Sequence, residues 1–146
     1  MPVRDAVFED VEEICSLIEE HAVYEEKHDL KLDRAEMSGH LFGPEPKAWV
    51  LMCTPPGRPD VIAGFAFCSW NFSTWEGRPG IWLDDLFIRP EHRRHGLGRE
   101  LLDALRARTT GRVEWDMQAG NAKAEAFYAQ LGAEPVPGWI RYRWRP

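Results

Sequence analysis

The chain has 146 residues with a formal net charge of −6, and 44% of its residues are hydrophobic. This length fits one domain with a substantial core, and we expect a single domain over residues 1–146. The acidic balance argues against a nucleic-acid binder, which normally presents a basic face, and the lack of an apolar run of about 18 residues argues against a membrane span.

The first third of the sequence predicts a short strand followed by two helices. Residues 1–4 can begin a strand, and apolar residues then recur at helical spacing from Phe8 to Glu26. Glutamates fall between these apolar positions and face solvent in the resulting amphipathic helix. A shorter helix is expected from Asp33 to Leu41, with Asp33 as its N-cap.

The middle of the sequence predicts three strands. Residues 48–53 and 61–70 are apolar runs rich in strand-forming residues, separated by the turn-forming segment TPPGRPD. These two runs therefore predict a hairpin. After another loop, residues 81–88 (IWLDDLFI) form a third strand that two aspartates interrupt.

Two helices and two strands are predicted after this group. A helix over 97–108 carries leucines on its inner face, and a strand follows at 112–119. A second helix over 121–132 ends at a glycine C-cap, and residues 138–144 are typical of a final strand. The strands at 81–88 and 112–119, joined by a helical crossover, should be parallel neighbours. This order predicts an α+β domain with a mixed sheet and helices on both faces.

The cysteines and histidines give no sign of a metal or disulfide role. Cys15, Cys53 and Cys68 are scattered without a CxxC pair, which is typical of buried, reduced thiols in a cytosolic protein. His92 and His95 have no third ligand spaced nearby. From these spacings we expect no metal. The segment MPVRDAVFED has charges where a secretory signal needs an apolar stretch, so we expect a cytoplasmic location.

The stretch RRHGLGRELLDAL, residues 93–105, gathers positive charge and glycine at the entrance to a helix. Gly96 and Gly98 let the backbone approach a ligand closely and point N–H groups at it. The start of the helix adds unsatisfied N–H donors and a positive dipole end. The pattern predicts a phosphate or pyrophosphate site that is neither a P-loop nor a Rossmann fingerprint. Glycines that serve only the turn, beside solvated arginines, are the alternative.

Several segments together resemble the GNAT superfamily of N-acetyltransferases, and within it the diamine and polyamine branch (spermidine/spermine-type and thialysine-type). They are LIEEHAVYEEK, GFAFCSWNFSTWEG, WLDDLFIRPEHRRHGLG and NAKAEAFYAQLGA, which span nearly the whole chain. The resemblance implies a mixed, mostly antiparallel sheet in an α/β sandwich. It also implies acetyl-CoA as the acetyl donor, a small-molecule amine as the acceptor and a homodimer.

The resemblance also implies roles for individual residues. Tyr128 would act as general acid near the thioester sulfur. For Asp84 the chemistry of the reaction favours a role as water-mediated base or as amine anchor, with Asp85 holding local structure. The residues that would contact acetyl-CoA are Leu86, Phe87, Ile88, Arg94, His95, Gly96, Leu97, Gly98, Arg99, Asn121, Ala122, Lys123 and Ala124. Those that would line the amine site are Tyr24, Glu25, Trp75, Asp84 and Asp116. The chain departs from the branch in having Asp84 where the branch has glutamate and Pro137 where an acid is expected.

The chemistry of amine acetylation suits these residue types. An alkylammonium has a pKa of about 10.4, and only its neutral form attacks a thioester, so a base should take the proton. Asp84 and Asp85 are adjacent in a strand and should point to opposite faces unless a bulge intervenes. Simple structural roles remain as alternatives: solvated aspartates, a core position for Tyr128, a loop anchor for Trp75 and a solvated helix end at Tyr24.

The sequence therefore predicts an acetyl-CoA-dependent N-acetyltransferase that acts on a primary amine of a small molecule, namely a diamine, a polyamine or a lysine-like amino acid. One alternative is acetylation of a protein N-terminus or lysine. Another, from a different class, is a sensor that binds acyl-CoA without turnover. Tyr128 and Asp84 favour the enzyme, since a sensor needs neither group.

Overall fold

The computed structural model describes residues 2–146. The chain forms two compact units, of which the first runs to Trp115 and the second from Asp116 to Pro146. In chain order the elements are β1 (Val3–Asp5), η1 (Phe8–Asp10), α1 (Val11–Tyr24), α2 (Arg34–Phe42), β2 (Trp49–Cys53), β3 (Gly64–Ser73), β4 (Arg78–Ile88), η2 (Pro90–His92), α3 (Leu97–Arg106), β5 (Val113–Glu114) and α4 (Ala122–Leu131).

The first unit is built on a five-stranded sheet in the order β1-β2-β3-β4-β5. The pairs from β1 to β4 are antiparallel, whereas β4 and β5 are parallel. The predicted hairpin of β2 and β3 and the predicted parallel pair are both confirmed. Because α3 links the parallel strands, it forms the crossover that such a pair requires.

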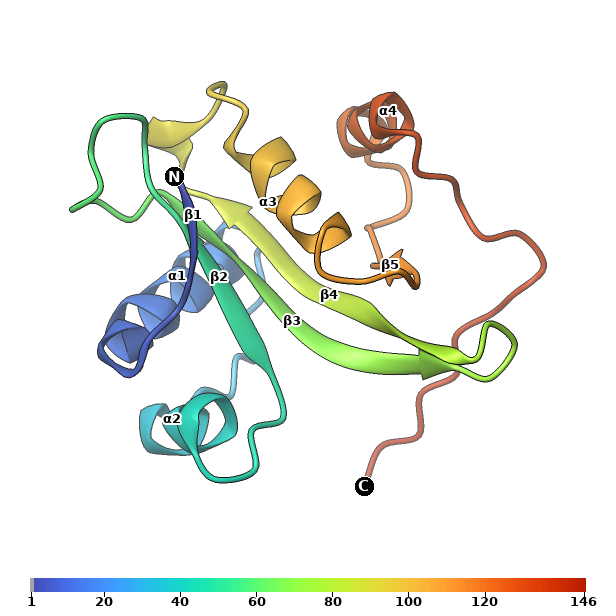
Figure 1. Cartoon of the computed structure of the whole chain (residues 1–146), viewed down its shortest axis with the longest axis horizontal. Coiled ribbons are helices and arrows are strands. Elements are labelled where there is room, and N and C mark those ends of the chain that lie inside the picture. Colours follow the sequence, from blue (N-terminus) through green and yellow to red (C-terminus); the bar gives the residue numbers. More distant parts are fainter. Residues whose placement is uncertain (1) are drawn as a thin grey trace. The chain divides into compact units, whose positions relative to one another are not determined.

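Helices cover both faces of this sheet, as the sequence predicted (Figure 1). On one face, Ile14 and Leu17 of α1 and Leu41 of α2 pack in one cluster with buried residues of β2, β3 and β4. The helix α3 lies on the opposite face (Figure 1), where its leucines Leu101 and Leu105 are fully buried. Alternating strand residues thus pack into a core on each face of the sheet. Because a shift by one residue would exchange the two faces, this packing fixes the register of the strands.

The helix ends follow from local hydrogen bonds. The predicted helix over 8–26 begins with the 3-10 turn η1, and α1 proper ends at Tyr24. The N-cap prediction for α2 is confirmed, because the carboxylate of Asp33 accepts a hydrogen bond of 2.9 Å from the backbone N–H of Glu36. The predicted glycine C-cap of α4 is confirmed at Gly132.

Two strand predictions in the C-terminal part are wrong. Within the predicted strand 112–119, only Val113 and Glu114 pair with β4. The predicted strand 138–144 is not a strand, and its aromatic side chains are exposed, up to 99% at Trp144. Alternating aromatic and basic residues favour extended backbone, but a strand exists only where a neighbour takes its hydrogen bonds, and residues 138–144 pair with no strand in residues 2–146.

The three cysteines are buried and free, as predicted. Desolvation raises the pKa of the Cys53 thiol to about 12, and it has the same effect on Cys68. Thiols of this kind stay protonated and behave as small apolar side chains.

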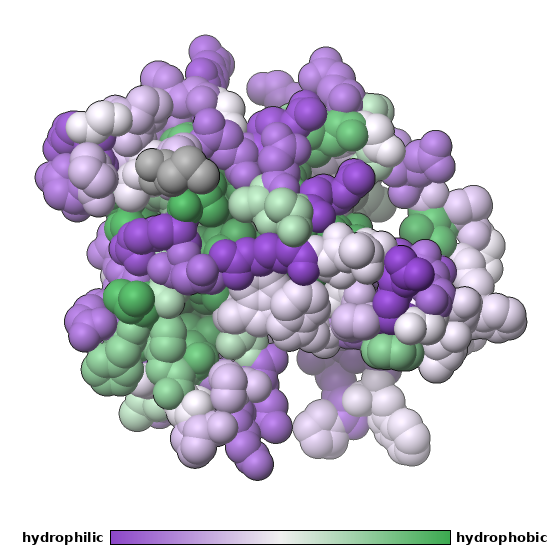
Figure 2. Space-filling view, in the orientation of Figure 1, coloured by the Kyte–Doolittle hydropathy of each residue, from purple (hydrophilic) through white to green (hydrophobic). Residues whose placement is uncertain are grey.

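The surface of the first unit carries apolar residues beside α2, where Figure 2 shows hydrophobic side chains gathered. Phe8 is 63% exposed and packs edge-on against Phe42, with ring centroids 6.2 Å apart. Within residues 2–146, no helix has the length and apolar character needed to cross a bilayer.

The N-cap of α2 can be tested by replacing Asp33. Replacing it (Asp33→Ala) removes the side-chain acceptor for the Glu36 N–H and should lower the free energy of unfolding by about 1 kcal/mol. Asp33→Asn keeps an acceptor at the same place and should be close to the parent chain. Urea denaturation of the three proteins measures both differences, and an alanine variant as stable as the parent would contradict the capping role.

Candidate active site

The two aspartates of β4 meet at a bulge. In the pairing with β3, Phe67 lies opposite Asp85 and Cys68 lies opposite Leu83, so Asp84 is an extra residue without a partner position. A bulge of this kind breaks the strict alternation of side chains along a strand. The sequence left open whether one or both carboxylates could face a common site, and at the bulge Asp85 lies close enough for its charge to raise the pKa of Asp84.

The electrostatic surroundings of Asp84 favour its protonated form. Desolvation by the surrounding atoms raises the pKa of Asp84 most, although the residue as a whole is exposed, and the like charge of Asp85 adds to the effect. A hydrogen bond from Trp82 and the positive charge of Lys27 act in the opposite direction. The net direction is upward, which is the direction needed for a carboxylate that accepts protons from an amine.

Asp85 faces helix α1. Its Oδ1 lies 3.3 Å from Nε2 of His21, and the imidazole also packs on the ring of Phe87 with centroids 5.1 Å apart. Sequence reasoning missed His21. A signal was present, because His21 occupies an apolar-stripe position of α1, seven residues after the buried Ile14.

The end of α1 comes close to the end of β4 through an arginine. The guanidinium of Arg93 lies 4.5 Å from the ring centroid of Tyr24 and 5.7 Å from that of Phe87. Its Nε also donates a hydrogen bond of 2.8 Å to the carbonyl of Ile88. One face of the Tyr24 ring therefore already holds a cation of the protein itself, and Glu25 caps the helix next to it.

The glycine-rich turn before α3 contains left-handed backbone at two positions. Gly96 is the N-cap of α3 in the left-handed region, with φ at 75°, and nothing lies within 4 Å of a Cβ built on it. Arg94 also has positive φ, at 70°, while Leu97 is buried and anchors the first turn of the helix. Arg94, His95 and Arg99 are exposed, and Arg99 pairs with Asp103 one turn along.

The strand segment before this turn has one edge that β5 leaves open. Leu86, Phe87 and Ile88 pair with β3 on one side. On the other side β5 pairs with β4 at Ile81 and Trp82 and at no later position. Backbone groups beyond Trp82 on that edge therefore lack a β5 neighbour, which suits them to bind an extended ligand.

Trp75 is not brought to the aspartates. It is 89% exposed in the turn between β3 and β4, and about six strand residues separate that turn from Asp84. At about 3.3 Å per residue the separation is about 20 Å. A role for Trp75 at the amine site stays a prediction.

The remaining predicted residues belong to the second unit. Asn121 is the N-cap of α4, where its Oδ1 accepts a hydrogen bond of 3.1 Å from the Ala124 N–H, and Tyr128 packs against Phe127 with ring centroids 5.5 Å apart. Asp116 forms an ion pair with Arg141 in the same unit. The approach of Tyr128, Asp116 and the 121–124 segment to Asp84 stays a prediction.

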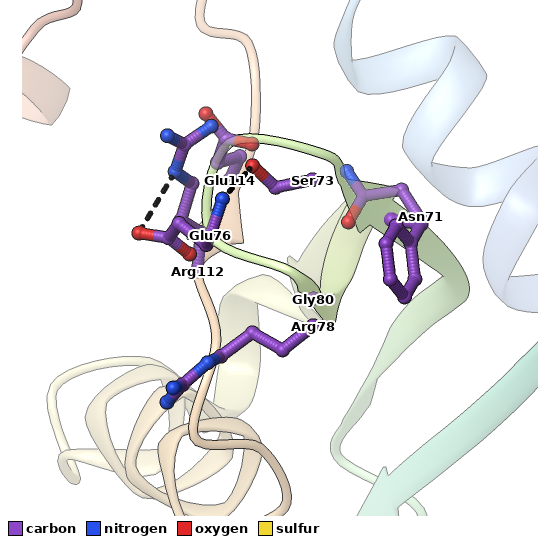
Figure 3. Close-up of a pocket in the computed structure, with 8 residues that line it drawn as sticks. Asn71, Ser73, Glu76, Arg78, Gly80, Arg112 and Glu114 are labelled. Carbon is purple, nitrogen blue, oxygen red and sulfur yellow. Dashed lines mark hydrogen bonds and ion pairs between the residues drawn. The ribbon is translucent and has the colours of Figure 1, made fainter.

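A small polar pocket lies at the far end of the β3–β4 hairpin (Figure 3). Glu76 and Arg112 form an ion pair of 3.3 Å on its wall, and the hydroxyl of Ser73 accepts a hydrogen bond from the backbone N–H of Glu76. Neither aspartate of the bulge lines this pocket. We therefore place the candidate site at the bulge and the α3 turn.

The raised pKa of Asp84 gives a stability test. The folded chain holds the Asp84 proton more tightly than the unfolded chain, so this group's contribution is fully present below the ordinary pKa of 3.8 and is lost as pH rises through the raised value. Asp84→Asn should therefore unfold at a higher temperature than the parent at pH 7, and this advantage should disappear near pH 3.

Asp10 is the matched control, since Arg4 lowers its pKa through a hydrogen bond. Its contribution is present above the ordinary value and is lost as pH falls. Asp10→Asn should therefore be less stable than the parent at pH 7. A loss of stability in Asp84→Asn at pH 7 would contradict a raised pKa for Asp84.

The chain also has recognisable relatives. The model of the acetyltransferase (GNAT) family matches residues 7–133. An L-ornithine N5-acetyltransferase from Arabidopsis thaliana is 35% identical over 83 residues, which cover 54% of this chain and 36% of that protein. A thialysine N-epsilon-acetyltransferase from Caenorhabditis elegans is 35% identical over 88 residues, which cover 56% of this chain and 54% of that protein.

Solved structures agree on the fold. A possible acetyltransferase from Clostridium difficile 630 superimposes with a TM-score of 0.83 at 18% identity, over 99% of this chain and 96% of that one. An aminoglycoside acetyltransferase from an uncultured soil metagenomic sample gives a TM-score of 0.76 at 15% identity, over 98% and 95% of the two chains. With the family model matching most of its residues, the chain belongs to the GNAT family of acetyltransferases.

Proposed function

We propose that the protein transfers an acetyl group from acetyl-CoA to a primary amine of a small molecule. The observation that carries the proposal is the carboxylate pair at the β4 bulge, in which the pKa of Asp84 is raised. The pair lies in the same unit as the glycine-rich turn of α3, four residues before the last residue of β4. A proton acceptor and an anion-binding turn on one strand-turn-helix segment suit an amine acetyltransferase.

The α3 turn fits the diphosphate of acetyl-CoA. Gly96 leaves open space where a side chain would stand, and the first turn of α3 offers backbone N–H groups to an anion. Arg94, His95 and Arg99 are exposed beside these groups and add positive charge. Bound there, acetyl-CoA supplies a thioester carbonyl, and the open edge of β4 at Leu86, Phe87 and Ile88 would hold its extended arm.

Asp84 takes the proton that the amine must lose. Deprotonating an alkylammonium at pH 7 costs about 3–5 kcal/mol, so attack needs an acceptor within reach, directly or through one water. A carboxylate with a raised pKa narrows the gap to the ammonium. Tyr128 would return a proton to the departing thiolate, a role that requires its hydroxyl to approach the sulfur.

The substrate class we propose is a diamine, a polyamine or a lysine-like amino acid. The two relatives named for ornithine and thialysine favour the amino-acid end of this range. Glu25 at the end of α1 and the aspartates of β4 would bind the cationic part of such a substrate. A homodimer, which the family resemblance implies, and a cytoplasmic location, which the cysteine pattern and the charged N-terminal segment favour, stay predictions.

A panel of amines tests the proposal directly. A diamine, a monoamine of equal length and a lysine-like zwitterion are incubated with acetyl-CoA, and thiol release gives kcat/KM at low and high salt. The doubly charged amine should be preferred over the monoamine, and the preference should fade as the Debye length falls from about 10 Å at 0.1 M to about 3 Å at 1 M salt. Glu25→Gln should weaken this preference without changing kcat for the monoamine.

Failure has two distinct forms. If no amine releases thiol from acetyl-CoA, the acetyltransferase proposal fails. If the monoamine is equally good and Glu25→Gln changes nothing, only the substrate class is wrong. A preference for the zwitterion over the diamine selects the amino-acid substrate.

The acetyl-CoA site is tested at Gly98, in the first turn of α3. Gly98→Val places a branched side chain beside the N–H groups that would meet the diphosphate, and KM for acetyl-CoA should rise more than tenfold while kcat changes little. Gly96→Val is a poorer test, because φ at 75° strains any residue with a Cβ. Calorimetric binding of CoA to a folded Gly98→Val protein at the parental affinity would contradict the site.

A further inference from the structure

Arg93 contacts elements of both proposed binding regions. Its guanidinium lies 4.5 Å from the ring centroid of Tyr24, which ends α1 in the region proposed to bind the amine. Its Nε donates a hydrogen bond of 2.8 Å to the carbonyl of Ile88, the last residue of the strand segment proposed to hold the acetyl-CoA arm. In the chain it directly precedes Arg94, the first residue of the proposed diphosphate site. One side chain therefore joins the two regions.

The contacts of Arg93 are those of a brace between elements. Its guanidinium also lies 5.7 Å from the ring centroid of Phe87, and the rings of Phe87 and Tyr24 are 6.3 Å apart, so the three side chains form one cluster. Within residues 2–146, Arg93 forms no ion pair with a carboxylate. A planar guanidinium can cover an aromatic ring while its Nε–H donates to a carbonyl, and neither lysine nor methionine can reproduce both contacts.

The end of α1 has few other contacts to fix its position. Three backbone hydrogen bonds close the helix, in which the N–H groups of Glu25, Glu26 and Lys27 donate to α1 carbonyls at 2.9, 3.1 and 2.8 Å. Glu26 adopts left-handed backbone with φ at 55°, which is unfavourable for a residue with a Cβ. Residues 27–33 have no regular structure and are mostly exposed. A segment of this kind opens at low free energy, so one additional contact changes its stability measurably.

The turn that carries Arg93 is also weakly bonded within itself. The Arg93 N–H lies 3.3 Å from the carbonyl of Pro90, which is a long hydrogen bond, and the next residues, Arg94, His95 and Gly96, are exposed. An anion that accepts hydrogen bonds from the N–H groups of this turn would restrict its backbone. The restriction reaches Arg93 across a single peptide bond.

We propose that Arg93 is a positioning residue that couples the two binding regions: acetyl-CoA bound at the α3 turn fixes the backbone of Arg93, and the Arg93 side chain then holds Tyr24 and the end of α1 in place for the amine. The inference rests on the proposed function, because it takes the α3 turn as the acetyl-CoA site. Coupling between two sites is reciprocal, so the bound amine raises the affinity for CoA by the same factor.

Amide hydrogen exchange followed by NMR, with and without saturating CoA, measures this coupling without turnover. In the parent chain, CoA should slow exchange of the Glu25, Glu26 and Lys27 N–H groups by about fivefold or more, a usual size for coupling between sites. Arg93→Met keeps an unbranched stem but has neither the Nε–H nor the charge, so CoA should leave these rates unchanged. The Gly43 N–H, which bonds at the end of α2, is the internal reference and should not respond.

Further variants separate the contacts of Arg93. Arg93→Lys keeps the charge but lacks the planar fork, so the response to CoA should fall even if Arg93→Met does not fold. Tyr24→Phe keeps the ring and should keep the response, whereas Tyr24→Leu should lose it. Arg108→Met is the matched control, because Arg108 also covers an aromatic ring, that of Trp49 at 5.4 Å, outside both regions. It should retain the response despite the loss of its ion pair with Asp5.

Kinetics give a second readout, with L-lysine as the zwitterionic amine and a diaminobutane as the dicationic one. In Arg93→Met, KM for the amine should rise about tenfold, because the end of α1 is no longer held in place. The kcat at saturating amine should change little, since Arg93 takes no part in the chemistry. A merely structural role would instead reduce the folded fraction, which lowers the apparent kcat and leaves KM unchanged.

The outcomes separate this inference from the proposed function. If CoA binds the parent chain without slowing exchange at the end of α1, or if Arg93→Met responds as the parent does, the coupling role is overturned whatever the enzyme acetylates. If the exchange rates behave as expected but no amine is acetylated, the coupling stands and the proposed function fails. If calorimetry detects no binding of CoA to the parent chain, the acetyl-CoA site and the coupling both fail.

Discussion

The acidic site depends on one extra residue in strand β4. Without the bulge at Asp84, strict alternation would send Asp84 and Asp85 to opposite faces of the sheet, one toward α1 and one toward α3. The bulge lets Leu83 face Cys68 on the α3 side while Asp85 pairs with Phe67 on the α1 side. The two aspartates then lie close together. After desolvation, the negative charge of Asp85 is the largest influence that raises the pKa of Asp84.

Two arginines hold the elements around this bulge. Arg89, only 16% exposed, bonds to Glu13 and Glu20 of α1 and to the carbonyl of Ile62. Arg93 bonds to the carbonyl of Ile88 and lies on the ring of Tyr24. Exposed ion pairs contribute little to stability, but partly buried arginines with several fixed partners determine geometry. They therefore hold the end of α1 beside the α3 turn.

Much of this arrangement could be predicted from the sequence, because it depends on residues that are close together in the chain. The Asp33 cap, the β2–β3 hairpin and the shape of the turn at Gly96 all follow from residues within a few positions. The bulge could not be predicted, since it is decided by which residues of β3 face which residues of β4. The predicted strand at 138–144 failed for a similar reason, because alternation describes a strand's faces and says nothing of a partner. His21 was readable as a polar residue on an apolar stripe, but its partner Asp85 lies 64 positions away in the sequence and only the fold brings the two together.

The overall charge of the chain says less about its substrate than the local arrangement of charges does. Of the glutamates on α1, Glu12 and Glu19 share Arg34, and Glu13 and Glu20 share Arg89, so about half of the negative charge of these four residues is balanced within the protein. The negative charge at the β4 bulge remains, where Asp84 and Asp85 lie next to each other. If an ammonium binds at the β4 bulge, desolvation lowers the pKa of the ammonium. The same desolvation raises the pKa of Asp84. Desolvation therefore narrows the pKa gap that makes amine deprotonation costly, whereas the attraction between the ammonium and the carboxylates widens it, so a base at the β4 bulge acts best where water is most fully displaced.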